Sequence, residues 1–151
     1  MITILEANKE DLKSILDLQH LAYQSEAQLV GDTNIQPLTQ NLNEIQKEFN
    51  IMKFFKAVTE DGTIIGSVRV YSNDGTLHIG KLMVHPSLQG RGIGTQLLNH
   101  IETACPHTRY ELFTSFKSTR NIQLYERLGY RRFTEKKMPD GLTFIYLEKI
   151  I

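Results

Sequence analysis

Residues 82–94 have the sequence Leu82-Met83-Val84-His85-Pro86-Ser87-Leu88-Gln89-Gly90-Arg91-Gly92-Ile93-Gly94. This stretch is typical of a strand end, a short loop stopped by proline, and a glycine-rich turn that opens a helix. Three glycines at alternate positions permit positive φ and let a ligand approach the main chain. The free N–H groups of a helix beginning near Gly92, together with its dipole, favour a phosphate or pyrophosphate, and Arg91 adds a full charge nearby.

The glycine spacing separates the classes of phosphate ligand. A dinucleotide fingerprint, G-x-G-x-x-G, requires a third glycine where Thr95 stands, and the Gly-Lys-Ser/Thr end of a P-loop is absent. The pattern Gln89-x-x-Gly92-x-Gly94, after Leu82-x-Val84-x-Pro86, resembles the acetyl-CoA signature of the GNAT superfamily of N-acetyltransferases. A glycine-rich connection that merely joins a strand to a helix is the alternative interpretation of the glycines alone.

A second motif lies farther along the chain and supports the same family. Residues 121–130, Asn121-Ile122-Gln123-Leu124-Tyr125-Glu126-Arg127-Leu128-Gly129-Tyr130, resemble the GNAT segment N-x-x-x-Y-x-x-x-G-[FY]. The resemblance implies that Asn121 contacts the CoA arm and that Tyr125 is the general acid for the departing thiolate. A phenol with a pKa near ~10 can protonate a thiolate of similar basicity. Packing at the sheet edge for Tyr125 and local helix capping for Asn121 are the alternatives.

The resemblance also implies where acetyl-CoA, the co-substrate, would bind. Backbone groups of the fourth strand would hold the pantetheine amides and polarise the acetyl carbonyl, and donors aimed at a developing oxyanion are a large catalytic contribution. The predicted cofactor-binding residues are Leu82, Met83, Val84, Gln89, Gly90, Arg91, Gly92, Ile93, Gly94, Thr95 and Asn121.

The sequence leaves the general base open among several candidates. Some members of the family carry a glutamate on the fifth strand about five residues before the asparagine, but Phe116 stands there. Glu26, a water relay, or an amine that is already neutral are the open options. Glu26 lies in residues 25–40, which we expect to form an irregular loop that helps to wall the acceptor site. A solvated charge at a helix end is the alternative for Glu26.

Periodicity and turn signals predict seven strands and four helices in the order β-α-α-β-β-β-α-β-α-β-β. Asp-Gly at 61–62 and 74–75 separates β-rich runs, which predicts an antiparallel meander over residues 51–84. Asn8 is predicted to cap the first helix, which should end near residues 23–28, and Thr39 to cap the second. The fifth strand, 110–116, should lie parallel to the fourth through a right-handed crossover. We therefore expect an α/β fold with a mixed sheet, the GNAT acyl-CoA N-acyltransferase fold, as a single domain over residues 1–151.

Composition excludes several classes of function. The net charge is zero, so no broad basic field attracts nucleic acid or anionic lipid. No apolar run approaches the ~18 residues of a membrane span and no signal peptide is evident, which predicts a cytoplasmic protein. Cys105 is expected to be a buried, inert thiol on an apolar helix face. The five histidines show no ligand spacing, so we expect no metal.

These observations predict an acyltransferase. We expect the chain to transfer an acetyl group from acetyl-CoA to a primary amine, of a small molecule or of a protein or peptide, by direct attack in a ternary complex. An acyl-CoA-binding regulatory module with little or no turnover is the alternative, favoured by Phe116 and opposed by Tyr125. The identity of the amine and the oligomeric state, a homodimer among the possibilities, are left open by the sequence.

Overall fold

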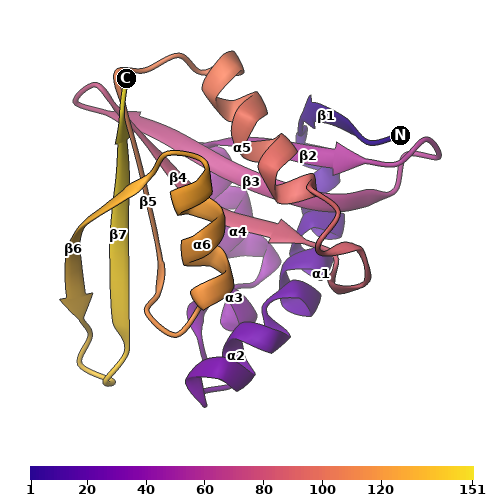
Figure 1. Cartoon of the computed structure of the whole chain (residues 1–151). Coiled ribbons are helices and arrows are strands. Elements are labelled where there is room, and N and C mark those ends of the chain that lie inside the picture. The colour runs from indigo at the N-terminus through magenta and orange to yellow at the C-terminus, as the bar shows by residue number, and fades with distance from the viewer.

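A single seven-stranded sheet of order β1-β2-β3-β4-β5-β7-β6 runs through the molecule (Figure 1). The structure is a computed structural model that describes residues 1–151. The strands are β1 (Thr3–Glu6), β2 (Lys53–Val58), β3 (Ile64–Asn73), β4 (Thr76–Val84), β5 (Arg109–Ser115), β6 (Arg131–Lys137) and β7 (Thr143–Ile150). The α-helices are α1 (Leu12–Ala22), α2 (Gln24–Val30), α3 (Gln36–Thr39), α4 (Leu42–Phe49), α5 (Ile93–Ala104) and α6 (Thr119–Arg127).

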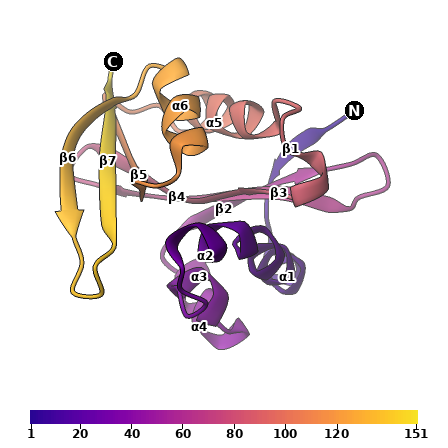
Figure 2. The ribbon, with the colours of Figure 1, turned by 60° about the horizontal axis from the view of Figure 1, so that its bottom comes forward.

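Helices cover both faces of the sheet. Figure 2 shows α1 to α4 on one face and α5 with α6 on the other. The larger apolar cluster lies under α5, where Leu97, Leu98 and Ile101 are fully buried against the strands. A smaller cluster joins α1 and α4 to Phe54 of β2. None of the helices has the length and apolar character needed to cross a membrane.

The pairing of the strands confirms the predicted meander and crossover. Strands β1 to β4 pair antiparallel in sequence order, and β5 pairs parallel with β4. That parallel pairing involves only Thr76–His78 of β4 and Arg109–Glu111 of β5, whereas β5 pairs with β7 along its whole length. The second halves of β4 and β5 therefore diverge, and a gap opens in the sheet.

A β-bulge lies on β4 beside this divergence. The register between β3 and β4 shifts between Ser67 and Arg69, and Lys81 on the bulged strand has φ of 52°. A positive φ in a non-glycine residue costs roughly 1–2 kcal/mol, so the fold elsewhere must maintain this conformation. The bulge directly precedes Leu82, where the predicted cofactor strand begins.

The helix count differs from the prediction because residues 25–40 are not an irregular loop. They contain most of α2 and all of α3, so six α-helices replace the predicted four. Gly31 ends α2 in a left-handed conformation, with φ of 73°, and Pro37 lies in the first turn of α3, where its missing N–H costs nothing. Residues read as breakers thus mark the ends of two short helices.

Two predicted caps had different outcomes. Asn8 acts as a cap, as predicted: it forms a capping box with Asp11 on a short 3₁₀ helix, Lys9–Asp11, that leads into α1. Thr39 does not cap the predicted second helix, which is α4 in the structure. The N-cap of α4 is Asn41, whose side chain accepts a hydrogen bond from the Glu44 N–H at 2.9 Å.

Cys105 also departs from the expectation. It lies just beyond the last residue of α5 and is only partly buried against the larger core.

Candidate active site

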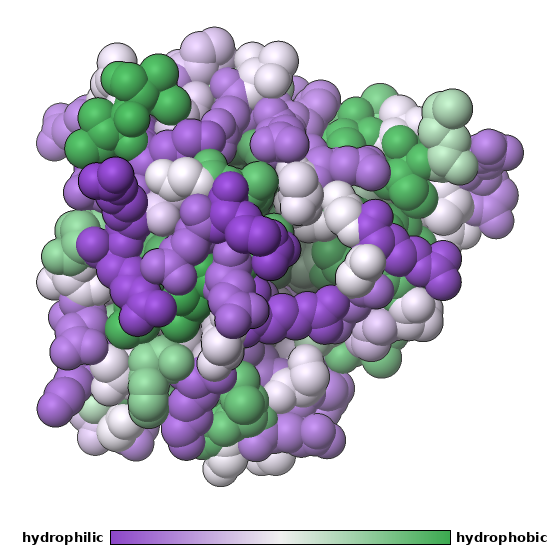
Figure 3. All heavy atoms as spheres, in the orientation of Figure 1, coloured by the Kyte–Doolittle hydropathy of each residue, from purple (hydrophilic) through white to green (hydrophobic).

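A cavity of about 780 Å³ lies where β4 and β5 diverge. Its walls are the junction of α1 and α2, the end of β4 with the following turn, the first turn of α5, and α6 with the loop before it. Figure 3 shows a hollow on this face of the molecule, with apolar atoms at its floor and hydrophilic side chains around it. The cavity therefore joins the glycine turn to the segment that sequence reasoning placed at the acceptor.

The glycine turn has the conformation that its sequence predicts. Gly90 and Gly92 have φ of 79° and 80°, and a Cβ at Gly92 would meet no atom within 4 Å. The first regular helix bond of α5 runs from the Gln96 N–H to the Gly92 carbonyl at 3.0 Å, so the preceding N–H groups have no partner within the helix. The turn is thus open to a ligand and lined by free donors.

Gly94 serves a different purpose from the other two glycines. Its φ is not positive, and a Cβ there would lie 3.4 Å from Cδ2 of Leu124 in α6. Gly94 therefore lies where α5 and α6 come close together.

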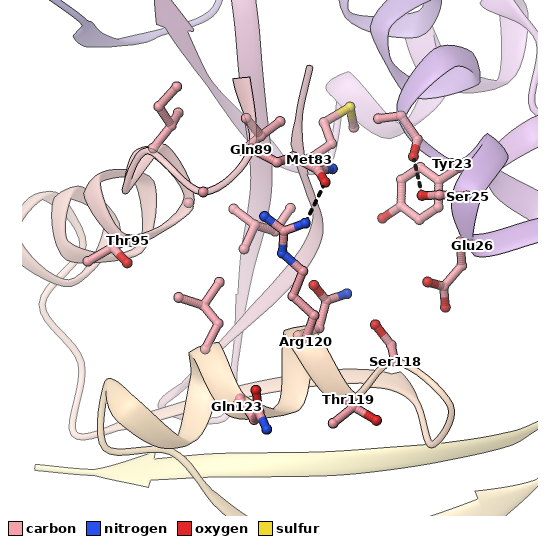
Figure 4. A pocket seen from close by; sticks show the side chains of 18 of the residues that line it. Tyr23, Ser25, Glu26, Met83, Gln89, Thr95, Ser118, Thr119, Arg120 and Gln123 are labelled. Atoms are coloured by element: carbon pink, nitrogen blue, oxygen red, sulfur yellow. Dashed lines mark hydrogen bonds between the residues drawn. The ribbon is translucent and has the colours of Figure 1, made fainter. Parts of the chain in front are cut away.

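Most of the predicted cofactor-binding residues meet around this one cavity. The predicted residues that line it are Leu82, Met83, Val84, Gln89, Gly90, Gly92, Ile93, Gly94, Thr95 and Asn121. Arg91 does not line it and is exposed. A different cation, Arg120 of α6, reaches across to the turn, and its Nη1 donates to Gln89 Oε1 at 2.8 Å (Figure 4).

Asn121 ties α6 to the sheet. Its Nδ2 donates to Oγ1 of Thr114 on β5 at 3.3 Å, so the side chain is not a local helix cap. The contact fixes the first turn of α6 beside the divergence of β4 and β5.

Tyr125 lies behind the cavity wall. It is buried, packs within the larger core, and its ring centroid is 6.3 Å from that of Tyr130. Its hydroxyl has no hydrogen-bond partner. Among unpaired side-chain polar atoms, Arg69 Nε alone is completely buried, so the Tyr125 hydroxyl keeps some access to solvent. Burial, followed by the charges of Tyr23 and Glu26, raises the pKa of Tyr125, which keeps the hydroxyl protonated at neutral pH.

Glu26 and Tyr23 form the opposite wall. Glu26 lies in the first turn of α2 and Tyr23 at the junction of α1 and α2, and both line the cavity (Figure 4). Burial raises the pKa of Glu26 above its ordinary value of 4.5. Neither of the two sequence motifs includes Tyr23. Its place at the end of α1, directly before a polar segment, is the signal that could have marked it.

A buried polar network supports this wall. Arg69 of β3 is fully buried and donates from Nη1 to Glu48 Oε1 at 2.8 Å and from Nη2 to Gln19 Oε1 at 2.6 Å. Its guanidinium also lies over the Phe54 ring, 4.5 Å from the centroid. The network binds α1 and α4 to β3 and so fixes the end of α1, where Tyr23 lies.

Lys81 lies beside the network. Burial and the charge of Arg69 lower the pKa of Lys81 to about 8. None of the sequence motifs pointed to either residue.

Solved structures of known acetyltransferases share this fold. The PaiA N-acetyltransferase of Thermoplasma acidophilum, in complex with coenzyme A, superimposes with a TM-score of 0.80 at 15% identity, covering 100% of this chain and 99% of its own. The ribosomal-protein-S18-alanine N-acetyltransferase of Escherichia coli has a TM-score of 0.77 at 20% identity, covering 100% and 94%. At these identities the likeness concerns the fold alone.

Sequence comparisons extend from a protein of similar sequence to a whole family. UPF0157 protein YqkA of Bacillus subtilis (strain 168) is 29% identical over an alignment of 147 residues that covers 94% of this chain and 41% of that protein. The chain thus spans less than half the length of this relative. The model of the family described as "Acetyltransferase (GNAT) domain" matches residues 18–151. The match covers most of the chain and the observed fold agrees with it, so the chain belongs to the GNAT acetyltransferase family that both sequence motifs predicted.

Proposed function

We propose that the protein transfers the acetyl group of acetyl-CoA to a primary amine by direct attack in a ternary complex. The observation that carries this proposal is the cavity itself, which connects an open glycine turn to a wall bearing the carboxyl of Glu26 and the phenol of Tyr23. Family membership supports acyl transfer, and coenzyme A in the PaiA structure supports the choice of cofactor. A cytoplasmic location stays a prediction of the sequence.

The cofactor would lie along the gap between β4 and β5. The edge of Leu82, Met83 and Val84 that faces β5 has no strand partner, so its backbone groups are available to amides and to the thioester carbonyl. The phosphates would lie at the turn from Gly90 to Gly92, beside the start of α5.

The chemical step then needs one base and one acid. The amine nitrogen attacks the thioester carbonyl carbon, Glu26 accepts the amine proton, and the C–S bond breaks as the Tyr125 hydroxyl gives its proton to the departing thiolate. The raised pKa of Glu26 makes it a stronger base once ionised, and the raised pKa of Tyr125 keeps the phenol in its acid form. Tyr23, which lines the cavity with Glu26, would help to orient the amine.

One observation favours the alternative, an acyl-CoA-binding module with little turnover. The Tyr125 ring belongs to the apolar core and does not line the cavity, which is the placement expected of a packing residue. The two functions share the cofactor site and differ in whether CoA is released.

The test is to incubate the protein with acetyl-CoA and a panel of amines, measure free CoA with a thiol reagent, and detect the acetylated amine by mass spectrometry. We expect CoA release to depend on the amine and to match the acetylated product mole for mole. Thermal stabilisation by acetyl-CoA without release for any amine would favour the binding module. No response to acetyl-CoA of either kind would contradict both functions.

A further inference from the structure

The charged side chains that line the cavity are distributed unevenly. Lys117, Arg120 and Arg127 belong to α6 or to the loop before it, and none of them forms an ion pair in the protein. Glu26 is the one carboxylate of the cavity, and it lies at the opposite end from the glycine turn (Figure 4). The α6 wall therefore carries uncompensated positive charge, suited to a ligand that is strongly anionic at one end.

Arg120 is the cation of this wall that reaches the turn. Its Nη1 donates to Gln89 Oε1 at 2.8 Å, and its Nη2 would lie 3.8 Å from a Cβ built on Gly90. Gln89 is neutral, so it orients the guanidinium without cancelling its charge. The fork of an arginine matches the paired oxygens of a phosphate, and its remaining N–H groups are free to donate.

Arg91, the cation suggested by sequence position, is placed differently. It is exposed and outside the cavity, although it stands between two glycines of the turn. Its position in the turn therefore does not bring its side chain to the cavity.

We propose that Arg120 of α6, held by Gln89, binds the pyrophosphate of acetyl-CoA against the glycine turn, a role that Arg91 does not fill. The inference rests on the proposed function, because it takes acetyl-CoA as the ligand. The cofactor phosphates would then lie between α5, which gives backbone donors, and α6, which gives the charge. Binding would tie together two helices that meet at Gly94 and Leu124.

The experiment compares Arg120→Gln with Arg91→Gln, and uses Arg131→Gln on the exposed strand β6 as a charge-matched control. Dissociation constants are measured by calorimetry for acetyl-CoA, for acetyl-dephospho-CoA, which lacks only the 3′-phosphate, and for S-acetylpantetheine, which lacks the pyrophosphate. Arg120→Gln should weaken the first two ligands equally, by about tenfold or more, as expected for a lost charge-assisted hydrogen bond. The affinity of Arg120→Gln for S-acetylpantetheine should match that of the unmodified protein. Arg91→Gln should lose less affinity for acetyl-CoA than Arg120→Gln does.

Three results would overturn the assignment of Arg120. Weakening of acetyl-CoA alone would assign Arg120 to the 3′-phosphate, weakening of S-acetylpantetheine would mean that the substitution distorts the cavity, and unchanged affinity for all three would exclude a contact. A failure of the proposed function gives a different result, because the unmodified protein itself would then not bind acetyl-CoA.

Discussion

Glu26 lines the cavity and Tyr125 is buried behind its wall, yet the charge of Glu26 acts on the Tyr125 phenol. After burial and the charge of Tyr23, the Glu26 carboxylate is the next cause that raises the pKa of Tyr125. Loss of the phenolic proton is therefore opposed while Glu26 is ionised, so one group holds a proton while the other can accept one. This is the pairing that amine attack and thiolate departure require.

Tyr125→Phe should lower turnover by about 100-fold or more, the usual effect of losing a positioned general acid, and leave acetyl-CoA affinity nearly unchanged. The ring that packs the core is retained and the hydroxyl has no partner to lose, so the melting temperature should not fall. Steady-state kinetics, calorimetry and thermal unfolding give the three readouts. Turnover within about twofold of the parent would leave Tyr125 a packing residue.

Glu26→Gln should lower kcat/KM most strongly for cationic amines and have little effect on acetyl-CoA affinity. If Glu26 is the base, activity falls as pH falls through its raised pKa, so the acidic limb should lie above pH 4.5 and disappear in the variant. When a carboxyl has a raised pKa in the folded state, the folded protein loses stability as the pH rises from the unfolded-state pKa through the raised value. The variant should therefore not be less stable at neutral pH. An unchanged pH profile for every accepted amine would remove Glu26 from the reaction.

Gly92→Asp should abolish stabilisation by acetyl-CoA. For the parent protein that stabilisation is about 2.7 kcal/mol at 100 times the dissociation constant. The substitution places a negative charge where the phosphates should lie. Gly92→Ala is the matched control, because it shares the strain of φ at 80° without the charge. Thermal shifts with and without acetyl-CoA measure the difference, and an equal shift in Gly92→Asp and the parent would locate the phosphates elsewhere.

Glu48→Ala should reduce the free energy of unfolding by about 3 kcal/mol, because it leaves the buried Arg69 without its counter-charge. Asp17→Ala is the control: its pair with Lys13 is exposed and should be worth under about 1 kcal/mol. Urea denaturation measures both. Equal losses in the two variants would show that the Arg69 network contributes little to stability.

Local patterns predicted the parts of the fold that local interactions determine. Asp-Gly turns placed the hairpins that join β2, β3 and β4, and Asn8 caps the first helical turn as expected. The segment at 25–40 was wrong because Gly31 and Pro37 act at helix boundaries in short helices just as they act in loops.

The candidate site was less predictable where it depends on distant partners. Arg69 lies in a β-rich run, and nothing in its neighbours indicates that its partners are Gln19 and Glu48. Likewise, Arg120 meets Gln89 only because α6 packs beside α5, whereas Arg91 lies within the turn and does not line the cavity.

The short pairing of β4 with β5 also bears on how the molecule opens. Three register pairs join β1–β4 to β5–β7, so the sheet has two parts connected by one short stretch of pairing, which we call the seam. Local opening can separate the two parts at a lower free-energy cost than global unfolding. Amides beside the seam should therefore exchange with solvent sooner than amides at the centre of the seam. The seam and the cavity are adjacent, so a molecule bound across the gap between β4 and β5 restrains the motion of one part of the sheet against the other. In this protein, slow exchange at the seam would report occupancy of the cavity.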